Sequence, residues 1–138
     1  MRLDSMLTVV HVSALLIWIG SVLSAYVAAR VTSVDDATRQ VIALKVFKWL
    51  ARPAFLIALV FGAIRLGMDW RHYLVTTHFM HAKLSLALVA IVAHHFLGAR
   101  IRSSSTALAF RRPASTVAVV TFALSCLAAV FVIVVRPM

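Results

Sequence analysis

The feature that most constrains this chain is a set of apolar runs without charge. Residues 5–29 contain no Asp, Glu, Lys or Arg, and neither do residues 113–135. At 1.5 Å of rise per residue, each run forms a helix longer than the hydrocarbon core of a bilayer, which is about 30 Å thick. A third run, residues 78–99, is interrupted only by Lys83. The sequence therefore predicts membrane-spanning helices over these three segments.

A fourth span is predicted from a shorter run. Only residues 53–64 separate Arg52 from Arg65, which is about 18 Å of helix and too short to cross. We therefore expect this helix to cover about residues 49–68, with its arginine side chains reaching toward the membrane boundaries. Ahead of it, residues 34–48 mix apolar and basic side chains at helical spacing, which predicts a short amphipathic helix at the membrane surface. Pro53, at the junction, is expected to kink the chain.

Composition supports a membrane protein and argues against nucleic-acid binding. Of the 138 residues, 63% are apolar and 13% charged, whereas soluble domains are about half apolar and about a quarter charged. The formal net charge of +10 would favour nucleic acid in a soluble protein. Here most Lys and Arg residues stand in short loops beside the apolar runs, where they set the topology and contact anionic lipid. We expect membrane lipid, and no nucleic acid, as a partner.

These segments predict an all-α fold, an integral membrane four-helix bundle in a single domain. Lys and Arg are more frequent in the first and third loops than on the other side, by nine to four. Because basic loops stay in the cytoplasm, we expect both termini outside and the amphipathic helix on the cytoplasmic side. Small residues four apart, such as Ala54, Ala58 and Gly62, are typical of closely packed membrane helices. We expect a multi-pass protein of a bacterial inner membrane, and homo-oligomer formation stays open.

Polar groups at membrane depth are the candidates for chemistry, because they are costly there unless they serve a function. His11 lies about two turns into the first helix from its outer end. His81 and Lys83 lie about one turn into the third helix, also from the outer end. With both termini outside, these three side chains share one depth in the membrane.

Helical phase divides the third helix into two polar stripes. His81 and His95 point within about 40° of each other, and Lys83 and His94 within about 20°. Each stripe runs from the outer to the inner leaflet. In the first helix, Trp18 follows the outer histidine by seven residues and shares its face.

Histidines on two facing helices at one depth are an arrangement that can hold haem iron axially. We therefore expect haem b as the cofactor, with His11 and His81 as candidate iron ligands. The haem propionates need cations, and Arg65 and Arg71 lie at the matching outer end. The full set of expected cofactor-binding residues is His11, Trp18, Arg65, Arg71, His81, Lys83 and His94.

Two alternatives stay open. Thioether and imidazole ligands suit copper, particularly Cu(I), so the outer end could instead hold that metal. The alternative copper ligands are Met6, His11, His78, Met80 and His81, with Met68, His72 and Met138 on the same side. In the second alternative the histidines only join helices, and the chain is a structural accessory subunit of a membrane complex. Hydrolysis and phosphoryl transfer lack the residue sets they require.

The third helix resembles that of a known family. Met80-His81-Ala82-Lys83-Leu84, followed after an apolar stretch by Ala93-His94-His95-Phe96-Leu97-Gly98, is similar to helix 3 of the HemJ-type protoporphyrinogen IX oxidases. Val10-His11-Val12 and Trp18-Ile19-Gly20 resemble that family's first helix, and Val134-Val135-Arg136-Pro137 its usual ending. The related copper-resistance D (CopD-like) membrane domain shares a lysine in helix 3 but matches the paired histidines less closely.

The resemblance implies a b-type haem protein that removes electrons from a porphyrinogen, with His11 and Lys83 as functionally important positions. Lys83 is then the expected catalytic residue, and a porphyrin or an electron-transfer partner the expected binding partner. Before helix 4 the family usually has Asn-Glu, whereas this chain reads Arg112-Pro113-Ala114-Ser115. The chain thus resembles a divergent member, and both an oxidoreductase and a haem-binding relative without oxidase activity stay open.

Overall fold

The computed structural model describes residues 3–68, 70–76, 78–103, 110 and 113–134, and these contain helices and no strand. The α-helices are α1 (Leu3–Ala28), α2 (Asp36–Val46), α3 (Arg52–Met68), α4 (His78–Ser103) and α6 (Pro113–Val134). Two short π-helical segments, η1 (Phe47–Ala51) and η2 (His72–Thr76), precede α3 and α4.

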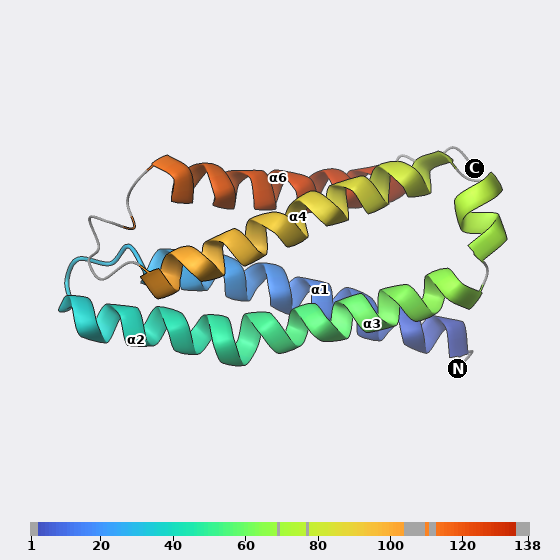
Figure 1. Ribbon diagram of the computed structural model, residues 1–138. Coiled ribbons are helices and arrows are strands. Elements are labelled where there is room, and N and C mark those ends of the chain that lie inside the picture. Colours follow the sequence, from blue (N-terminus) through green and yellow to red (C-terminus); the bar gives the residue numbers. More distant parts are fainter. Residues whose placement is uncertain (1–2, 69, 77, 104–109, 111–112, 135–138) are drawn as a thin grey trace.

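The long helices run side by side along one axis, so that the start of α1 and the end of α6 lie at the same end of the bundle (Figure 1). We call this the terminal end and the opposite one the loop end. Within the described residues, four segments are long and apolar enough to cross a membrane: Ser5–Ala28, Asp36–Met68, Phe79–Ser103 and Pro113–Phe131. The predicted all-α architecture with four apolar spans is confirmed.

The segment before α3 does not form a separate helix. In the structure α2, η1 and α3 are continuous from Asp36 to Met68. Pro53 lacks a backbone N–H, and its ring crowds the carbonyl four residues earlier. The π-helical turn directly before it widens the helix locally, which accommodates both the missing hydrogen bond and the ring. At 33 residues the continuous helix is about 50 Å long, so it exceeds the hydrocarbon core by about 20 Å.

The start of α2 is fixed by a cap and by a buried arginine. Asp35 accepts a hydrogen bond from the backbone N–H of Thr38 at 2.9 Å, and hydrogen bonds from the Thr38 side chain and backbone lower the pKa of the Asp35 carboxyl. Arg39 is only 2% exposed; it donates to the Ala29 carbonyl at 2.9 Å and lies 3.1 Å from an Asp36 carboxylate oxygen. These contacts hold α2 against the end of α1.

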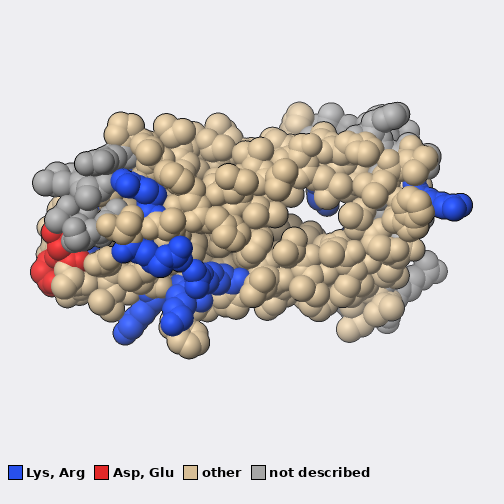
Figure 2. All heavy atoms as spheres, in the orientation of Figure 1, with Lys and Arg blue, Asp and Glu red and all other residues tan. Residues whose placement is uncertain are grey.

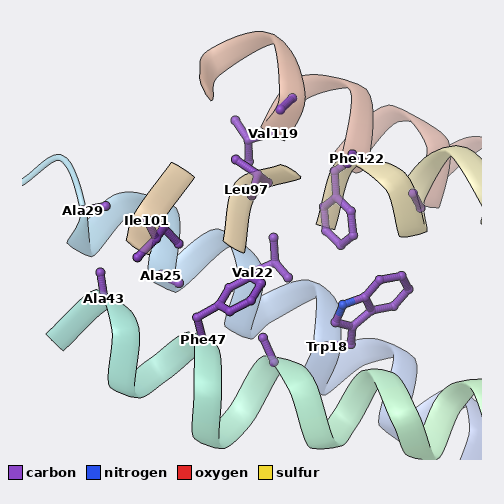
Figure 3. Close-up of a cluster of buried hydrophobic side chains, with 14 of the residues drawn as sticks. Trp18, Val22, Ala25, Ala29, Ala43, Phe47, Leu97, Ile101, Val119 and Phe122 are labelled. Atoms are coloured by element: carbon purple, nitrogen blue, oxygen red, sulfur yellow. The ribbon is translucent and has the colours of Figure 1, made fainter. Parts of the chain in front are cut away.

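The hydrophobic core fills the loop-end half of the bundle. Its large side chains include Trp18, Phe47, Leu97 and Phe122, which come from four different helical segments and point toward one another (Figure 3). The ring of Phe47 packs directly on Gly98, where an added Cβ would lie 2.5 Å from ring atom Cε1. Close packing at this end joins the α1/α3 pair to the α4/α6 pair.

The terminal-end half is packed more loosely. Its buried side chains, among those described, are the small Ala14, Ala58 and Ser125, together with Met80. Each helix pair stays packed within itself, but few large side chains fill the space between the pairs. The loop-end core therefore holds the bundle together and leaves room between the pairs at the terminal end.

Candidate functional site

An opening lies between the α1/α3 pair and the α4/α6 pair in the terminal-end half. Figure 2 shows the surface hollowed there, with basic atoms at the rim of the opening. The described Lys and Arg residues of this half are Arg65, Arg71 and Lys83. Because the rest of this half is largely apolar, the opening combines apolar walls with a small number of cations.

His11 is oriented by a backbone carbonyl. Its Nδ1 lies 2.8 Å from the carbonyl oxygen of Ala58 on α3. Since a carbonyl only accepts, Nδ1 donates, and Nε2 of the neutral ring keeps a free lone pair. Histidine metal ligands are commonly held in this way, with one ring nitrogen bonded to a carbonyl or carboxylate and the other on the metal. The imidazole is thus prepared to bind a metal or a proton through Nε2.

A glycine makes room for this ring. A Cβ at Gly62 would lie 2.8 Å from Cε1 of His11 and 3.2 Å from its Nδ1. Gly62 follows the carbonyl partner, Ala58, by one helical turn. The imidazole of His11 on α1 therefore packs against the stripe of small residues on α3, which includes Ala58 and Gly62.

Two cations from different helices lie near His11. The charges of Lys83 on α4 and Arg65 on α3 both act electrostatically on the imidazole, and Arg65 also acts on Lys83. Both basic side chains are partly buried. Among the described residues, Lys83 takes part in no hydrogen bond or ion pair. Two partly buried cations repel each other in a medium of low dielectric constant, so this arrangement favours an anionic ligand.

His81 and Arg71 lie at the outer surface instead. The exposed His81 donates from Nε2 to the carbonyl of Leu74 in η2, at 2.9 Å. Arg71 is exposed, with its guanidinium 5.6 Å from the ring centroid of Trp70. Over the described part of the chain, neither side chain has a hydrogen bond or ring contact with His11. The structure therefore brings together His11, Lys83 and Arg65, but not these two.

Trp18 and His94 form a second polar pair, buried within the core. They are 5% and 3% exposed, and the indole Nε1 donates to Nδ1 of His94 at 3.1 Å. The imidazole is also stacked on Phe47, with ring centroids 4.7 Å apart. Because Nδ1 accepts, the neutral ring carries its proton on Nε2, and neither nitrogen offers a lone pair to a metal while this bond is kept.

The alternative copper residues differ in exposure. Met6 and Met68 are exposed, Met80 is buried, and His72 is exposed in η2. Met138 and the side chain of His78 lie outside the described part. The described residues contain no group of three or more His, Cys, Asp or Glu side chains that could hold a metal ion. Methionine is not among those four residue types, so the copper alternative stays a prediction.

The two polar stripes of α4 have different surroundings. The stripe of Lys83 and His94 is partly or fully buried, whereas that of His81 and His95 is exposed. Sequence reasoning separated the stripes but could not tell which one faces the bundle. It also missed the Ala58 carbonyl as the partner of His11, since a backbone acceptor leaves no signal in the sequence.

A further hollow lies away from these polar groups. It is an apolar groove between α4 and α6, lined by Leu88, Val89, Val92, Ala93, Phe96, Ala118 and Thr121. None of the candidate site residues lines it. A lipid acyl chain could cover such a surface, so we place the candidate site at His11 instead.

Comparison with known proteins does not assign the chain to a family. No family model matches it, and neither does any curated protein or solved structure. The likeness to the HemJ-type oxidases therefore rests on the residues of the first and third helices and stays a prediction.

Proposed function

We propose that this chain is a multi-pass membrane protein that binds a b-type haem in the terminal-end opening and acts in redox chemistry. The observation that carries the proposal is the orientation of His11. Its Nδ1 is occupied by the Ala58 carbonyl, so that Nε2 is left as a ligand. Lys83 and Arg65 lie within electrostatic range of the same ring.

The residues present fit a haem in three respects. His11 would hold the iron through Nε2, the loosely packed space between the helix pairs would provide apolar walls, and Lys83 and Arg65 would provide cations for the propionates. A bound haem would supply one-electron chemistry at its iron. His81 would hold the same group only if its Nε2 released the Leu74 carbonyl or if the ring bound through Nδ1. Arg71, exposed at the outer surface, is a further propionate partner.

In this proposal, Lys83 is the residue that would bind a substrate carboxylate. An ammonium within a membrane span is costly unless it meets an anion. The propionates of haem and the carboxylates of a porphyrinogen are both suitable anions. In an oxidase, Lys83 would hold the substrate carboxylate and thereby place the macrocycle in the opening; in a haem-binding relative without oxidase activity, it would hold haem alone.

The test is an absorption spectrum of detergent-purified protein together with metal analysis. We expect a Soret band and iron in a fixed ratio to the chain. Stoichiometric copper without a Soret band would contradict haem binding and favour the copper-binding alternative. Protein that carries neither metal after expression with added haem precursor would favour a structural accessory subunit.

We also propose an orientation in a bacterial inner membrane. The loop end carries most of the Lys and Arg residues, and basic loops are retained in the cytoplasm. Both chain ends would then face the periplasm. A periplasmic alkaline phosphatase reporter should be silent when fused after Ser104 and active when fused after Met138. The reverse pattern would contradict this orientation.

A further inference from the structure

The continuous helix of α2, η1 and α3 runs beside the last turns of α4 at the loop end. Gln40 donates to the carbonyl of Arg102 at 3.2 Å, and the ring of Phe55 lies 5.7 Å from that of His95. Between these two contacts, Phe47 packs on Gly98. The two helical segments therefore meet along a seam of about four turns, from Gln40 to Phe55.

Exposed basic residues lie on both segments over these turns, and we call Lys45, Lys48, Arg52 and Arg102 the basic seam. All four side chains are exposed. The first three are three and four residues apart, which places them on one face of the continuous helix over about 10 Å. Arg102 belongs to the end of α4 that Gln40 contacts. Figure 2 shows Lys and Arg atoms gathered over this half of the bundle, with the acidic atoms confined to its tip.

The basic seam lies at the level expected for lipid headgroups. Trp49, between two of its members, is 70% exposed, and the Lys48 ammonium lies 5.6 Å from its ring centroid. Exposed tryptophan rings concentrate at the membrane–water interface. Toward the terminal end, α3 continues with the exposed apolar side chains of Leu56 and Leu59. The cations therefore lie where the apolar surface begins.

Carboxylates do not neutralise the basic seam. In the described part of the chain, Asp35 is the cap of α2 and Asp36 pairs with Arg39. Among the described side chains, no ion pair joins an acidic residue to the four basic ones. Three cations on two turns of the continuous helix and one at the end of α4, all without a carboxylate partner in the described residues, carry more charge than one phosphate diester can balance.

We infer that the basic seam binds the headgroup of a phospholipid with two phosphate groups, of the diphosphatidylglycerol class. One phosphate would lie near Lys48 and Arg52, the other near Lys45 and Arg102. Arginine and lysine donate strong charge-assisted hydrogen bonds to phosphate oxygens, and basic pockets between membrane helices bind such headgroups. The acyl chains would cover the exposed apolar surface of α3. This inference does not depend on haem.

The test uses the full chain in detergent, with lipid binding measured by native mass spectrometry. Wild type should bind diphosphatidylglycerol more tightly than phosphatidylglycerol, and phosphatidylcholine least. The double variant Lys48→Gln/Arg52→Gln should bind diphosphatidylglycerol about thirtyfold more weakly, because each basic residue near a headgroup contributes about fivefold. Arg71→Gln is the matched control, since it removes an exposed arginine at the opposite end, and it should leave binding unchanged.

Equal binding of the one-phosphate and two-phosphate lipids by wild type would overturn the inference. So would an equal loss of binding in the double variant and in Arg71→Gln, because that result would reflect net charge alone. A second variant, Lys45→Gln/Arg102→Gln, repeats the test at the other phosphate position. Thermal unfolding of each variant without lipid verifies that the bundle is intact. Inorganic pyrophosphate, added as a competitor at equal concentration, should not displace the lipid, because it lacks acyl chains.

Discussion

The indole Nε1 of Trp18 donates to Nδ1 of His94 across 3.1 Å, within the core that joins α1 to α4. Because an indole N–H can only donate, Nδ1 of the imidazole accepts, and the neutral ring carries its proton on Nε2. It also fixes which faces of the two helices meet, since each polar group would otherwise be buried without a partner. His94 is thereby assigned to the structure of the core, whereas His11 keeps a nitrogen lone pair for chemistry.

Replacing the donor tests this role. Trp18→Phe keeps an aromatic ring but leaves Nδ1 of His94 without its donor, so the free energy of unfolding should fall by about 1–2 kcal/mol or more. The measurement is unfolding by SDS titration in mixed micelles, followed by circular dichroism. Trp49→Phe is the control, because that ring is 70% exposed. Equal losses in the two variants would contradict a special role for the Trp18–His94 bond.

The packing of Phe47 on Gly98 gives a second prediction. Gly98→Ala would place Cβ 2.5 Å from Cε1 of the Phe47 ring, so the ring must move away from its stacked position on His94. Overpacking of this kind typically costs about 1–3 kcal/mol. Gly20→Ala should not destabilise the protein, because no atom lies within 4 Å of the added Cβ. If thermal unfolding ranked the two alanine variants in the opposite order, the described core packing would be wrong.

The spans were predictable because charge-free apolar runs set the length of a membrane helix. The predicted spans 5–29, 78–99 and 113–135 compare with Leu3–Ala28, His78–Ser103 and Pro113–Val134. α4 extends four residues further, since Arg100 and Arg102 continue the helix beyond the hydrocarbon. The continuity of α2 with α3 was not predictable, because a proline usually ends or kinks a helix and the compensating π-helical turn has no sequence signature.

The candidate site was predictable only in part. Membrane depth drew attention to His11, Lys83 and Arg65, and the structure places these three near one another. Depth alone could not separate His81 from them, because α4 has a polar stripe on two of its faces and its sequence does not show which stripe faces inward. The axial pairing of His11 with His81 therefore stays a prediction.

The packing of the His11 ring against Gly62 gives a third prediction. Gly62→Ala should displace the imidazole, since the new methyl group would lie 2.8 Å from Cε1. The Ala58 hydrogen bond would then be lost, and haem content should fall by about tenfold or more, because losing the partner that orients a histidine ligand typically weakens metal binding by that much. Gly67→Ala on the same helix meets no atom within 4 Å and serves as the control. Unchanged haem content in Gly62→Ala would mean that the ring orientation does not matter for binding.

Lys83 can be tested by removing its charge and keeping its stem. Lys83→Met should leave the protein folded in the membrane, because the unpaired ammonium is costly there. Haem affinity should fall by about tenfold, which corresponds to about 1.4 kcal/mol for a lost charge contact with a propionate. Lys48→Met, at the loop end, should leave the affinity unchanged. A Lys83→Met variant with full haem affinity and lower thermal stability would instead mean that the lysine stabilises the fold.

The most direct test of the account is the haem content of His11→Ala, measured from the pyridine haemochrome spectrum of protein purified beside wild type and His72→Ala. His72 is an exposed histidine of η2, so its replacement controls for the loss of an imidazole outside the proposed site. The account predicts that wild type and His72→Ala contain equal haem and that His11→Ala has lost nearly all of it. Equal haem in all three proteins would contradict the assignment of His11 as the iron ligand.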